Sequence, residues 1–469
     1  MLEAAYKAWN DSAALRQRRR RYKHYTYGRQ WEDMTTAPNG EVMTEAEHIR
    51  LQGCTPLVNN MIRQLVKCVI GRFRASVAEC DPASAVEVAD EVSARNSLLE
   101  LDCRMLEEFL ISGCAIQRVV TERRMAGDGV WVDNVSPENF FVNKFTDPRG
   151  MDIELVGMLH SMSRGEVLMR FGGDAVKRRM IDRIYGTDRS PLSGDVIGVS
   201  DRSGFYEASH GRCRVIEVWT LESRAMLRCH DRDKAGYFLA PDTSAAGIER
   251  INADRREAGR GLIESVTVST MRWHCRYYTP TGELLDEFDS PYAHGMHPFA
   301  VKFFPLTDGE VHSFVEDVID QQKHVNRLIT LIDHIIGVSA KGVLLFPVDQ
   351  KPDFLTWQQI GDMWAMSNRI IPYEPRNSNR LPTQVISQGG DAGASQLLSL
   401  QLQLFQQISG VSDALQGRVS ASGTSAALFD SQLRSSAIAL QDLLDSFNSF
   451  RTVRNSLIVR SGSVGDQAY

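Results

Sequence analysis

Apolar residues recur at helical spacing in two long segments near the N-terminus. Residues 44–75 predict one helix that is interrupted by a turn at Pro56, and Gly71 is expected to end it. Residues 85–118 predict a second long amphipathic helix. Its apolar positions are Val92, Leu98, Leu99, Leu101, Met105, Phe109 and Leu110. Each segment therefore has one face suited to burial.

The middle of the chain shows the alternating and aromatic-rich patterns that are typical of strands. Strands are predicted over residues 130–135, 139–145, 213–221 and 291–304, with a hairpin over residues 263–287. Thr279-Pro280-Thr281-Gly282 supplies the turn of the hairpin. A short helix is predicted over residues 162–171 and an exposed polar insertion from 222 to 260, whereas the stretch 178–194 is basic and then loop-like and gives no clear signal.

The last third predicts two helices around a compact insert, followed by a glycine-rich loop and a last long helix. Their ranges are 311–336, 338–390, 392–409, 410–424 and 425–459. The insert is expected to contain strands at 342–346 and 369–372 and a short helix at 357–366. The helix at 392–409 has no charged residue and mixes Leu with Gln. A solvated helix normally carries charge and a buried one avoids so much Gln, which favours a place between subunits or beside a channel.

The overall composition is that of a globular protein. The chain has 469 residues, 43% hydrophobic and 24% charged, with a net charge of -6. At roughly 150 residues per domain this length predicts about three domains. Because strong DNA binding normally needs a basic surface, any contact with nucleic acid is expected to be weak and local.

The N-terminal 30 residues depart from this balance. No acid stands between Asp11 and Glu32, while the segment holds Arg16, Arg18, Arg19, Arg20, Arg21, Lys23 and Arg29. Two interpretations stay open, a solvated helix face and an anion-binding arm.

The cysteines and the hydropathy pattern bear on the compartment. None of the eight cysteines forms a C-x-x-C pair, so reduced and mostly buried thiols in a cytosolic protein are expected. Neither a signal peptide nor a membrane span is predicted.

The sequence contains no complete catalytic or metal-binding motif. The phosphate-binding, dinucleotide-binding, serine-hydrolase and zinc-protease motifs are missing from the sequence. Asp231 to Asp242 resembles a calcium loop, but Ala235 occupies a ligand position, which favours a simple turn. His294 and His297 lack a third ligand at a suitable spacing, which favours a turn before a strand. No catalytic residue, metal or cofactor is therefore predicted.

Short motifs occur in a fixed order between about residues 22 and 455. They are Tyr25-Thr-Tyr27-Gly-Arg-Gln30-Trp31, Pro56-Leu-Val-Asn59-Asn60 with the helix ending Val69-Ile-Gly71, Val135 to Phe141, Asp152 to Phe171, His297-Pro298-Phe299, Gly309 to Glu316, Asp320-Gln321-Gln322-x-x-x-Asn326, Gly410-Val411, Ala414 to Gly417, and Ser422-Gly423. In this order they resemble the portal (head-to-tail connector) family of tailed bacteriophages.

The resemblance implies an α+β fold with the parts of a portal subunit. They would be a mixed α/β wing at 1–310, a stem helix at 311–337, a small α/β clip at 338–390, a second stem helix at 391–409, a tunnel loop at 410–424, a long wing helix at 425–459 and a short tail at 460–469, with the crown minimal or absent.

The resemblance also implies a function and partners. The chain would form a ring, usually a dodecamer, at the capsid vertex, as the channel for viral DNA packaging and ejection. Its partners would be further copies of itself, double-stranded DNA without sequence specificity, the terminase large subunit, the major capsid protein or scaffold, and a head–tail adaptor. It would be a structural protein, without enzyme activity, cofactor or membrane association, in the virion and in the host cytoplasm during assembly.

Three groups of residues are candidates for these contacts. The tunnel loop offers Gly410, Gln416, Gly417, Arg418, Ser420, Ser422 and Gly423, of which Arg418 is expected to touch DNA. The first stem helix offers Gln322, Lys323, Asn326 and Arg327. Lys323 and Arg327 would face the lumen or the capsid, or form an ordinary surface pair. The clip offers Trp357, Trp364, Arg369, Arg376 and Arg380, with the tryptophans either anchoring partners or filling the core of the insert.

Two other classes of protein remain as alternatives. Another head–tail connector or capsid structural protein would share the compartment, but an adaptor is usually far shorter and a capsid protein lacks the helix–insert–helix order. A DNA-processing enzyme such as a nuclease would need clustered acids in a pocket, and the sequence shows no such cluster.

Overall fold

A long antiparallel pair of strands organises one part of the molecule. In this computed structural model, β7 (Cys213–Asp231) pairs with β9 (Ile263–Tyr278) from Ile216↔Tyr278 to Asp231↔Ile263. Their sheet has the order β10–β9–β7–β6–β5, with β8 beside the far end of β7. The remaining strands are β5 (Phe140–Val142), β6 (Leu155–Met162), β8 (Gly236–Pro241) and β10 (Leu284–Asp289).

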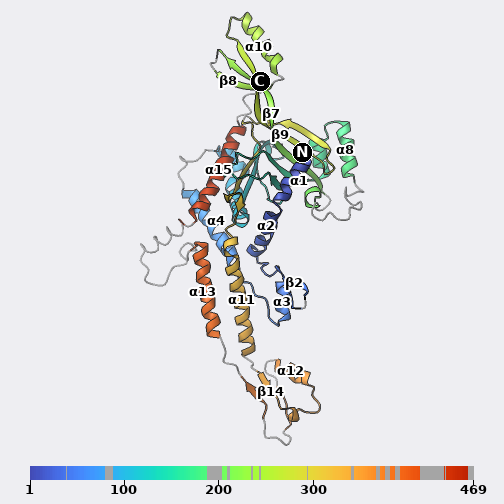
Figure 1. Cartoon of the computed structure of the whole chain (residues 1–469), viewed down its shortest axis with the longest axis vertical. Coiled ribbons are helices and arrows are strands. Elements are labelled where there is room, and N and C mark those ends of the chain that lie inside the picture. Colours follow the sequence, from blue (N-terminus) through green and yellow to red (C-terminus); the bar gives the residue numbers. More distant parts are fainter. Residues whose placement is uncertain are drawn as a thin grey trace. The chain divides into compact units, whose positions relative to one another are not determined.

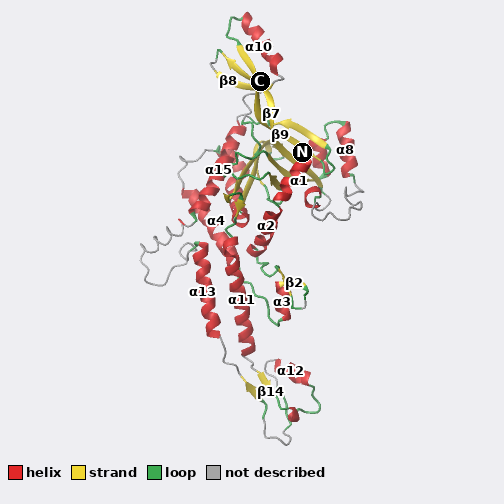
Figure 2. Cartoon of the chain, in the orientation of Figure 1, coloured by secondary structure: helices red, strands yellow, loops and turns green. Residues whose placement is uncertain are grey.

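The chain mixes helices and strands (Figure 2), so the α+β class is confirmed. The structure describes residues 1–38, 40–79, 88–186, 203–208, 212–233, 236–241, 244–292, 294–339, 343–365, 370–374, 381–385, 391–411, 438 and 440–462. Two compact units result, and each is described by itself. The first comprises Met1–Arg20, Cys68–Phe314 and Leu440–Tyr469, and the second Arg21–Lys67 and Val315–Ala439.

The main core of the first unit lies on one face of this sheet. Trp219, Cys275 and Tyr277 point into it from β7 and β9. Two helices pack on the same core, α7 (Arg164–Phe171) through Phe171 and α8 (Ala175–Tyr185) through Ile181. On the opposite face, α1 (Leu2–Asp11) packs through Trp9.

One strand boundary predicted for this unit is wrong. The strand predicted to end at Leu221 continues to Asp231, because Leu227 and Cys229 are buried against α10 (Ala245–Glu257) while Arg228 between them is exposed. The basic part of the stretch 178–194, for which the sequence gives no clear signal, belongs to helix α8 as far as Tyr185. The arginines of α8 lie outside the core, and in the sequence they obscure the short apolar stripe of this helix. The hairpin predicted over 263–287 is confirmed as β9 and β10.

A second, three-stranded sheet has the order β11–β3–β4. Its strands are β3 (Cys114–Arg124), β4 (Gly127–Asn134) and β11 (Phe299–Phe303), and it packs against α6 (Leu98–Ser112) and α15 (Gln441–Gly462). The single helix predicted over 85–118 is wrong. Ser97, with a φ of 49°, separates α5 (Asp90–Asn96) from α6, and Gly113, with a φ of 71°, ends α6.

A buried ion pair joins α15 to α6. The guanidinium of Arg454 donates to both carboxylate oxygens of Asp102 at 3.0 and 3.1 Å, and both residues are almost fully buried. Gln117 of β3 accepts a further bond from Arg454 at 3.3 Å. The pair therefore fixes the register of α15 against the three-stranded sheet.

The second unit contains α11 (Glu316–Ser339) and α13 (Asp391–Ser409), which pack side by side (Figure 1). Both predicted helices are confirmed, although α11 begins five residues later because Val311 belongs to the short strand β13 (Glu310–Val311). The helix α4 (Met61–Glu79) starts in this unit and runs through Gly71, so the prediction that Gly71 ends it is wrong. An added Cβ on Gly71 would meet open space, so no tight packing requires this glycine.

The segment between α11 and α13 forms a small α/β insert. It contains β14 (Val343–Leu345), α12 (Trp357–Ala365) and β15 (Thr383–Val385), and β14 pairs with β15. The predicted strand at 369–372 is not found over the described residues 370–372. The predicted last helix is described from Gln441 onward, and residues 425–437 lie outside the described part.

Candidate functional site

The four candidate residues of α11 lie on two successive turns and bind the N-terminal part of the second unit. Their partners come from the segments Tyr25–Trp31 and Pro56–Asn60 and from two acids, Asp33 and Glu45. Three of the sequence motifs that carry the family resemblance thus meet in one polar cluster, which we call the α11 cluster.

Gln322 is fully buried and caps the start of α4. Its Oε1 accepts the backbone N–H groups of Met61 at 3.0 Å and Ile62 at 3.3 Å, while its Nε2 donates to the carbonyl of Asn59 at 2.6 Å. The first N–H groups of a helix have no partner within the helix. One side chain therefore satisfies two of the free donors of α4 and the carbonyl that precedes them.

Asn326 extends these contacts to the first motif. Its Oδ1 accepts the N–H of Asn59 at 3.0 Å, and its Nδ2 donates to Oε1 of Gln30 at 2.5 Å. Gln30 in turn donates to the carbonyl of Tyr25 at 2.7 Å. Because these polar groups are buried, each lost bond would leave an unsatisfied partner.

Lys323 lies between two carboxylates. Its Nζ is 2.9 Å from Oδ2 of Asp33 and 3.0 Å from Oε1 of Glu45. Partial burial alone would raise the pKa of Asp33, but hydrogen bonds from Arg21, Lys323 and Tyr25 outweigh it and lower the pKa to about 2. Burial, together with the charge of Asp33, raises the pKa of Tyr25 to about 12.

The two cations of α11 differ in exposure. The side chain of Lys323 is 17% exposed and is held in the intrachain ion pairs, whereas that of Arg327 is 54% exposed and reaches Glu45 at 3.3 Å. Of the two, Arg327 is thus the one that keeps a surface for a contact outside the chain. The sequence does not single out Asp33 and Glu45, because nothing in their local pattern indicates a partner about 290 residues away.

The clip candidates are partly described. Trp357 opens α12, stays half-exposed and contacts Phe346 edge-on with ring centroids 6.0 Å apart. Among the described residues of the insert, Leu355 and Ile360, rather than the tryptophans, are the buried apolar residues. Trp364 is partly buried. Arg369, Arg376 and Arg380 lie outside the described residues.

The tunnel-loop candidates lie mostly outside the described residues. Gly410 follows α13 with a φ of 65°, a left-handed conformation that favours glycine at a helix end. The other candidates, Gln416, Gly417, Arg418, Ser420, Ser422 and Gly423, fall in the undescribed stretch.

The basic N-terminal run is largely neutralised within the chain. Arg19 binds Glu108 at 2.6 Å and Glu138 at 3.1 Å, and Arg20 binds Glu138 at 2.8 Å. In the second unit, Arg21 binds Asp33 at 2.9 Å. These ion pairs support neither a fully solvated face nor a free anion-binding arm.

The two weak metal-binding candidates are occupied by protein groups. Both carboxylate oxygens of Asp231 are bound by Arg255, at 2.7 and 2.9 Å. His297 accepts the N–H of Phe299 in a turn before β11, and burial lowers its pKa to about 3. Within the described ranges, no three His, Cys, Asp or Glu side chains gather to hold a metal.

Comparison with known proteins assigns the chain to a family. No described helix is long and apolar enough to cross a membrane. No curated protein matches the sequence. The family model described as Phage P22-like portal protein matches residues 2–458. This match covers nearly the whole chain and confirms the resemblance seen in the motifs, so the chain belongs to the P22-like phage portal protein family.

Proposed function

We propose that the chain forms the ring at the capsid vertex through which viral DNA is packaged and ejected. Membership of the portal family over residues 2–458 carries this proposal. The finer parts follow the order of elements: a wing at 1–310, stem helices at 311–337 and 391–409, a clip at 338–390, a tunnel loop at 410–424 and a long wing helix at 425–459. A dodecamer is the expected assembly.

The surface of α13 supports assembly around a channel. Between Ala392 and Ser409 the helix has no charged residue. Phe405 is buried, whereas Leu397, Leu400 and Ile408 are exposed at helical spacing. An uncharged helix with an exposed apolar stripe suits a contact with the next subunit, and its Gln side chains offer DNA hydrogen bonds without fixed charge.

The cation closest to DNA is proposed to be Arg418 of the tunnel loop. One such residue per subunit gives a ring of modest positive charge, which attracts phosphate without arresting the duplex. Arg418→Ala particles should package or retain less DNA than particles with the wild-type chain, measured as packaged genome length. Normal packaging and retention would rule out this role.

Arg327 is proposed to reach DNA or the capsid from the stem, whereas Lys323 holds α11 to the N-terminal segment. Arg327→Gln should change DNA retention or capsid incorporation and leave thermal stability nearly unchanged, because the side chain is mostly exposed. Lys323→Gln should instead lower stability, because it leaves Asp33 and Glu45 with fewer partners.

The clip is proposed to bind the terminase large subunit during packaging and a head–tail adaptor afterwards. The exposed part of Trp357 is a candidate anchor, because aromatic side chains dominate many interfaces. Trp357→Ala should weaken terminase binding, and so should the Arg376→Glu, Arg380→Glu double variant. Unchanged binding of either variant would remove those residues from the interface.

Native mass spectrometry with negative-stain imaging of the purified chain tests the whole proposal. A ring of identical subunits with a central hole is the expected result. A compact dimer that cleaves DNA would refute the portal function.

A further inference from the structure

At the far end of the large sheet, the edge strand β9 has no partner strand among the residues that the structure describes. Beyond β10, the sheet consists of β8, β7 and β9, and α10 covers one of its faces. Strand β10 pairs with β9 from His274 to Tyr278. Among the described residues, no strand pairs with the outer side of β9 from Ser265 to Met271.

The hydrogen bonds at both ends of this segment show which residues point outward. The carboxamide of Asn252 bonds the N–H and the C=O of Ile263, each at 2.8 Å, and the N–H of Ser290 bonds the C=O of Trp273 at 2.8 Å. Since the backbone groups of successive strand residues alternate in direction, those of the odd-numbered residues point away from β7. The four such residues between these ends are Ser265, Thr267, Ser269 and Met271.

This edge carries none of the usual protection against pairing. All four outward residues are exposed, and no described group bonds their backbone. The segment from Ser265 to Met271 has no charge and no proline, two features that natural edge strands use to block association. Its Thr and Val residues favour extended structure. An edge of this kind is a template for another strand.

The opposite edge of the same sheet has matching chemistry. Strand β8 reads Gly236-Tyr-Phe-Leu-Ala-Pro241 and is also uncharged. Tyr237 and Leu239 are 67% and 54% exposed. Arg228 of β7 is paired with Leu239 on one side and with Val266, 64% exposed, on the other, so the three share one face of the sheet.

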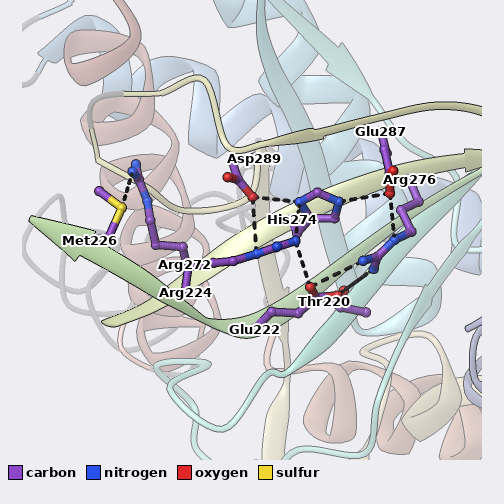
Figure 3. A network of polar contacts seen from close by, with 9 residues as sticks. All are labelled: Thr220, Glu222, Arg224, Met226, Arg272, His274, Arg276, Glu287 and Asp289. Atoms are coloured by element: carbon purple, nitrogen blue, oxygen red, sulfur yellow. Dashed lines mark hydrogen bonds and ion pairs between the residues drawn. The ribbon is translucent and has the colours of Figure 1, made fainter. Parts of the chain in front are cut away.

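The ion-paired part of this face lies elsewhere. Figure 3 shows the charges gathered around His274, where Glu222, Arg224 and Asp289 form a connected network. The uncharged edge begins past Arg272, which bonds Met226 instead of a carboxylate. The charged network thus leaves β8 and the part of β9 from Ser265 to Met271, between Glu264 and Arg272, free of charge.

We propose that the outer edge of β9 takes β8 of a second copy of the chain as its next strand. Both strands are antiparallel to β7 and therefore parallel to each other. Copies in a closed ring keep one direction relative to its axis, so β9 meets the next β8 in parallel. The row of Leu239 and Val266 then continues from one subunit to the next. This inference rests on the ring of the proposed function.

A photo-crosslink tests which strand occupies the edge. The photoreactive residue p-benzoylphenylalanine is incorporated at position 269, and rings assembled from a mixture of ¹⁴N- and ¹⁵N-labelled chains are irradiated. Mass spectrometry should find mixed-isotope cross-links to the peptide that contains Gly236–Pro241. Within one chain, β8 lies two strands away at about 10 Å, so the isotopes separate the two cases.

Charged edge variants give a second readout. Thr267→Lys with Ser269→Lys should raise the concentration for half-assembly about tenfold or more, since about 1.4 kcal/mol is one factor of ten. Ala253→Lys, on the exposed side of α10, is the matched control and should leave the concentration for half-assembly within about twofold of the wild-type value. Circular dichroism checks that the variants fold.

The outcomes separate this inference from the proposed function. Rings whose cross-links join position 269 to any other peptide, or to a different protein, overturn the pairing with β8 and leave the ring intact. Unchanged assembly of the double lysine variant overturns it as well. A chain that forms no ring, alone or in capsids, overturns the proposed function.

Discussion

Replacing Gln322 by leucine tests whether the α11 cluster holds the start of α4. Gln322 satisfies the N–H groups of Met61 and Ile62 and the carbonyl of Asn59. Leucine has a similar size but no polar atom, so it leaves the buried N–H of Ile62 without its partner, while the N–H of Met61 and the carbonyl of Asn59 keep only their bond to each other at 2.9 Å. The change therefore isolates hydrogen bonding from packing.

The expected cost follows from the groups that lose a partner. The N–H of Ile62, left without a partner, costs about 1–3 kcal/mol, and each lost bond to Met61 and Asn59, which keep each other, costs about 0.5–1.5 kcal/mol. Burial of the extra apolar surface of leucine returns about 1–2 kcal/mol. The net loss of local stability should be about 2–4 kcal/mol.

Hydrogen exchange of the first turn of α4 measures this loss directly. At about 1.4 kcal/mol per factor of ten, exchange of the Met61 and Ile62 amides should accelerate about 30- to 700-fold. Gln403→Leu, the same change on the exposed side of α13, should stay within about 0.5 kcal/mol. Gln322→Glu keeps the acceptor but loses the donor to Asn59, so its exchange rate should lie between those of the wild-type chain and Gln322→Leu.

The result that refutes this reasoning is specific. If Gln322→Leu accelerates exchange less than about threefold, water or a rearranged side chain satisfies α4 equally well, and the cluster does not cap the helix. If Gln403→Leu accelerates it as strongly, the effect belongs to the loss of any glutamine.

Three further predictions concern single buried contacts. The folded pKa of Asp33 is about 2, below its ordinary value of 3.8, so its ionised form stabilises the second unit above pH 3.8. About 1–2 kcal/mol of stability should be lost as the pH falls from 3.8 to 2. Denaturation at several pH values checks this, and Asp33→Asn should abolish this loss of stability between pH 3.8 and 2. Arg454→Met should destabilise the first unit by about 3–5 kcal/mol, and adding Asp102→Leu should recover much of the loss; denaturant unfolding that shows no recovery contradicts the ion-pair account. Gly113→Ala should lower the melting temperature, because the left-handed φ of 71° costs an alanine about 1–2 kcal/mol and its Cβ would lie 2.6 Å from the carbonyl oxygen of His312. An unchanged melting temperature would show that the backbone shifts to accommodate the Cβ.

The long periodic elements could be predicted because their signals are local. The helices α11 and α13 and the hairpin β9–β10 follow from a repeated spacing of apolar residues and, for the hairpin, from a turn that contains Pro280 and Gly282. The order of motifs along the chain also indicated the family, because a match of this kind needs only the sequence.

The predicted boundaries of helices and strands were wrong where contact with a distant element decides the conformation. The apolar spacing continues past Gly113, so the glycine alone did not mark a helix end in the sequence; its left-handed conformation and its tight approach to Val311 and His312 end α6 there. Conversely, Gly71 stays inside α4 because nothing around it requires a break. The strand β7 continues past Leu221 because α10 buries Leu227 and Cys229, a contact that local polarity conceals.

The roles of the α11 residues show the same division. The sequence by itself determined that Gln322, Lys323, Asn326 and Arg327 share a face of one helix, because their spacing is helical. Only the tertiary structure decided that all four bind the N-terminal segment and that Arg327 nevertheless stays mostly exposed. Periodicity reveals which face of a helix is shared, whereas the partner on that face depends on chain folding over hundreds of residues.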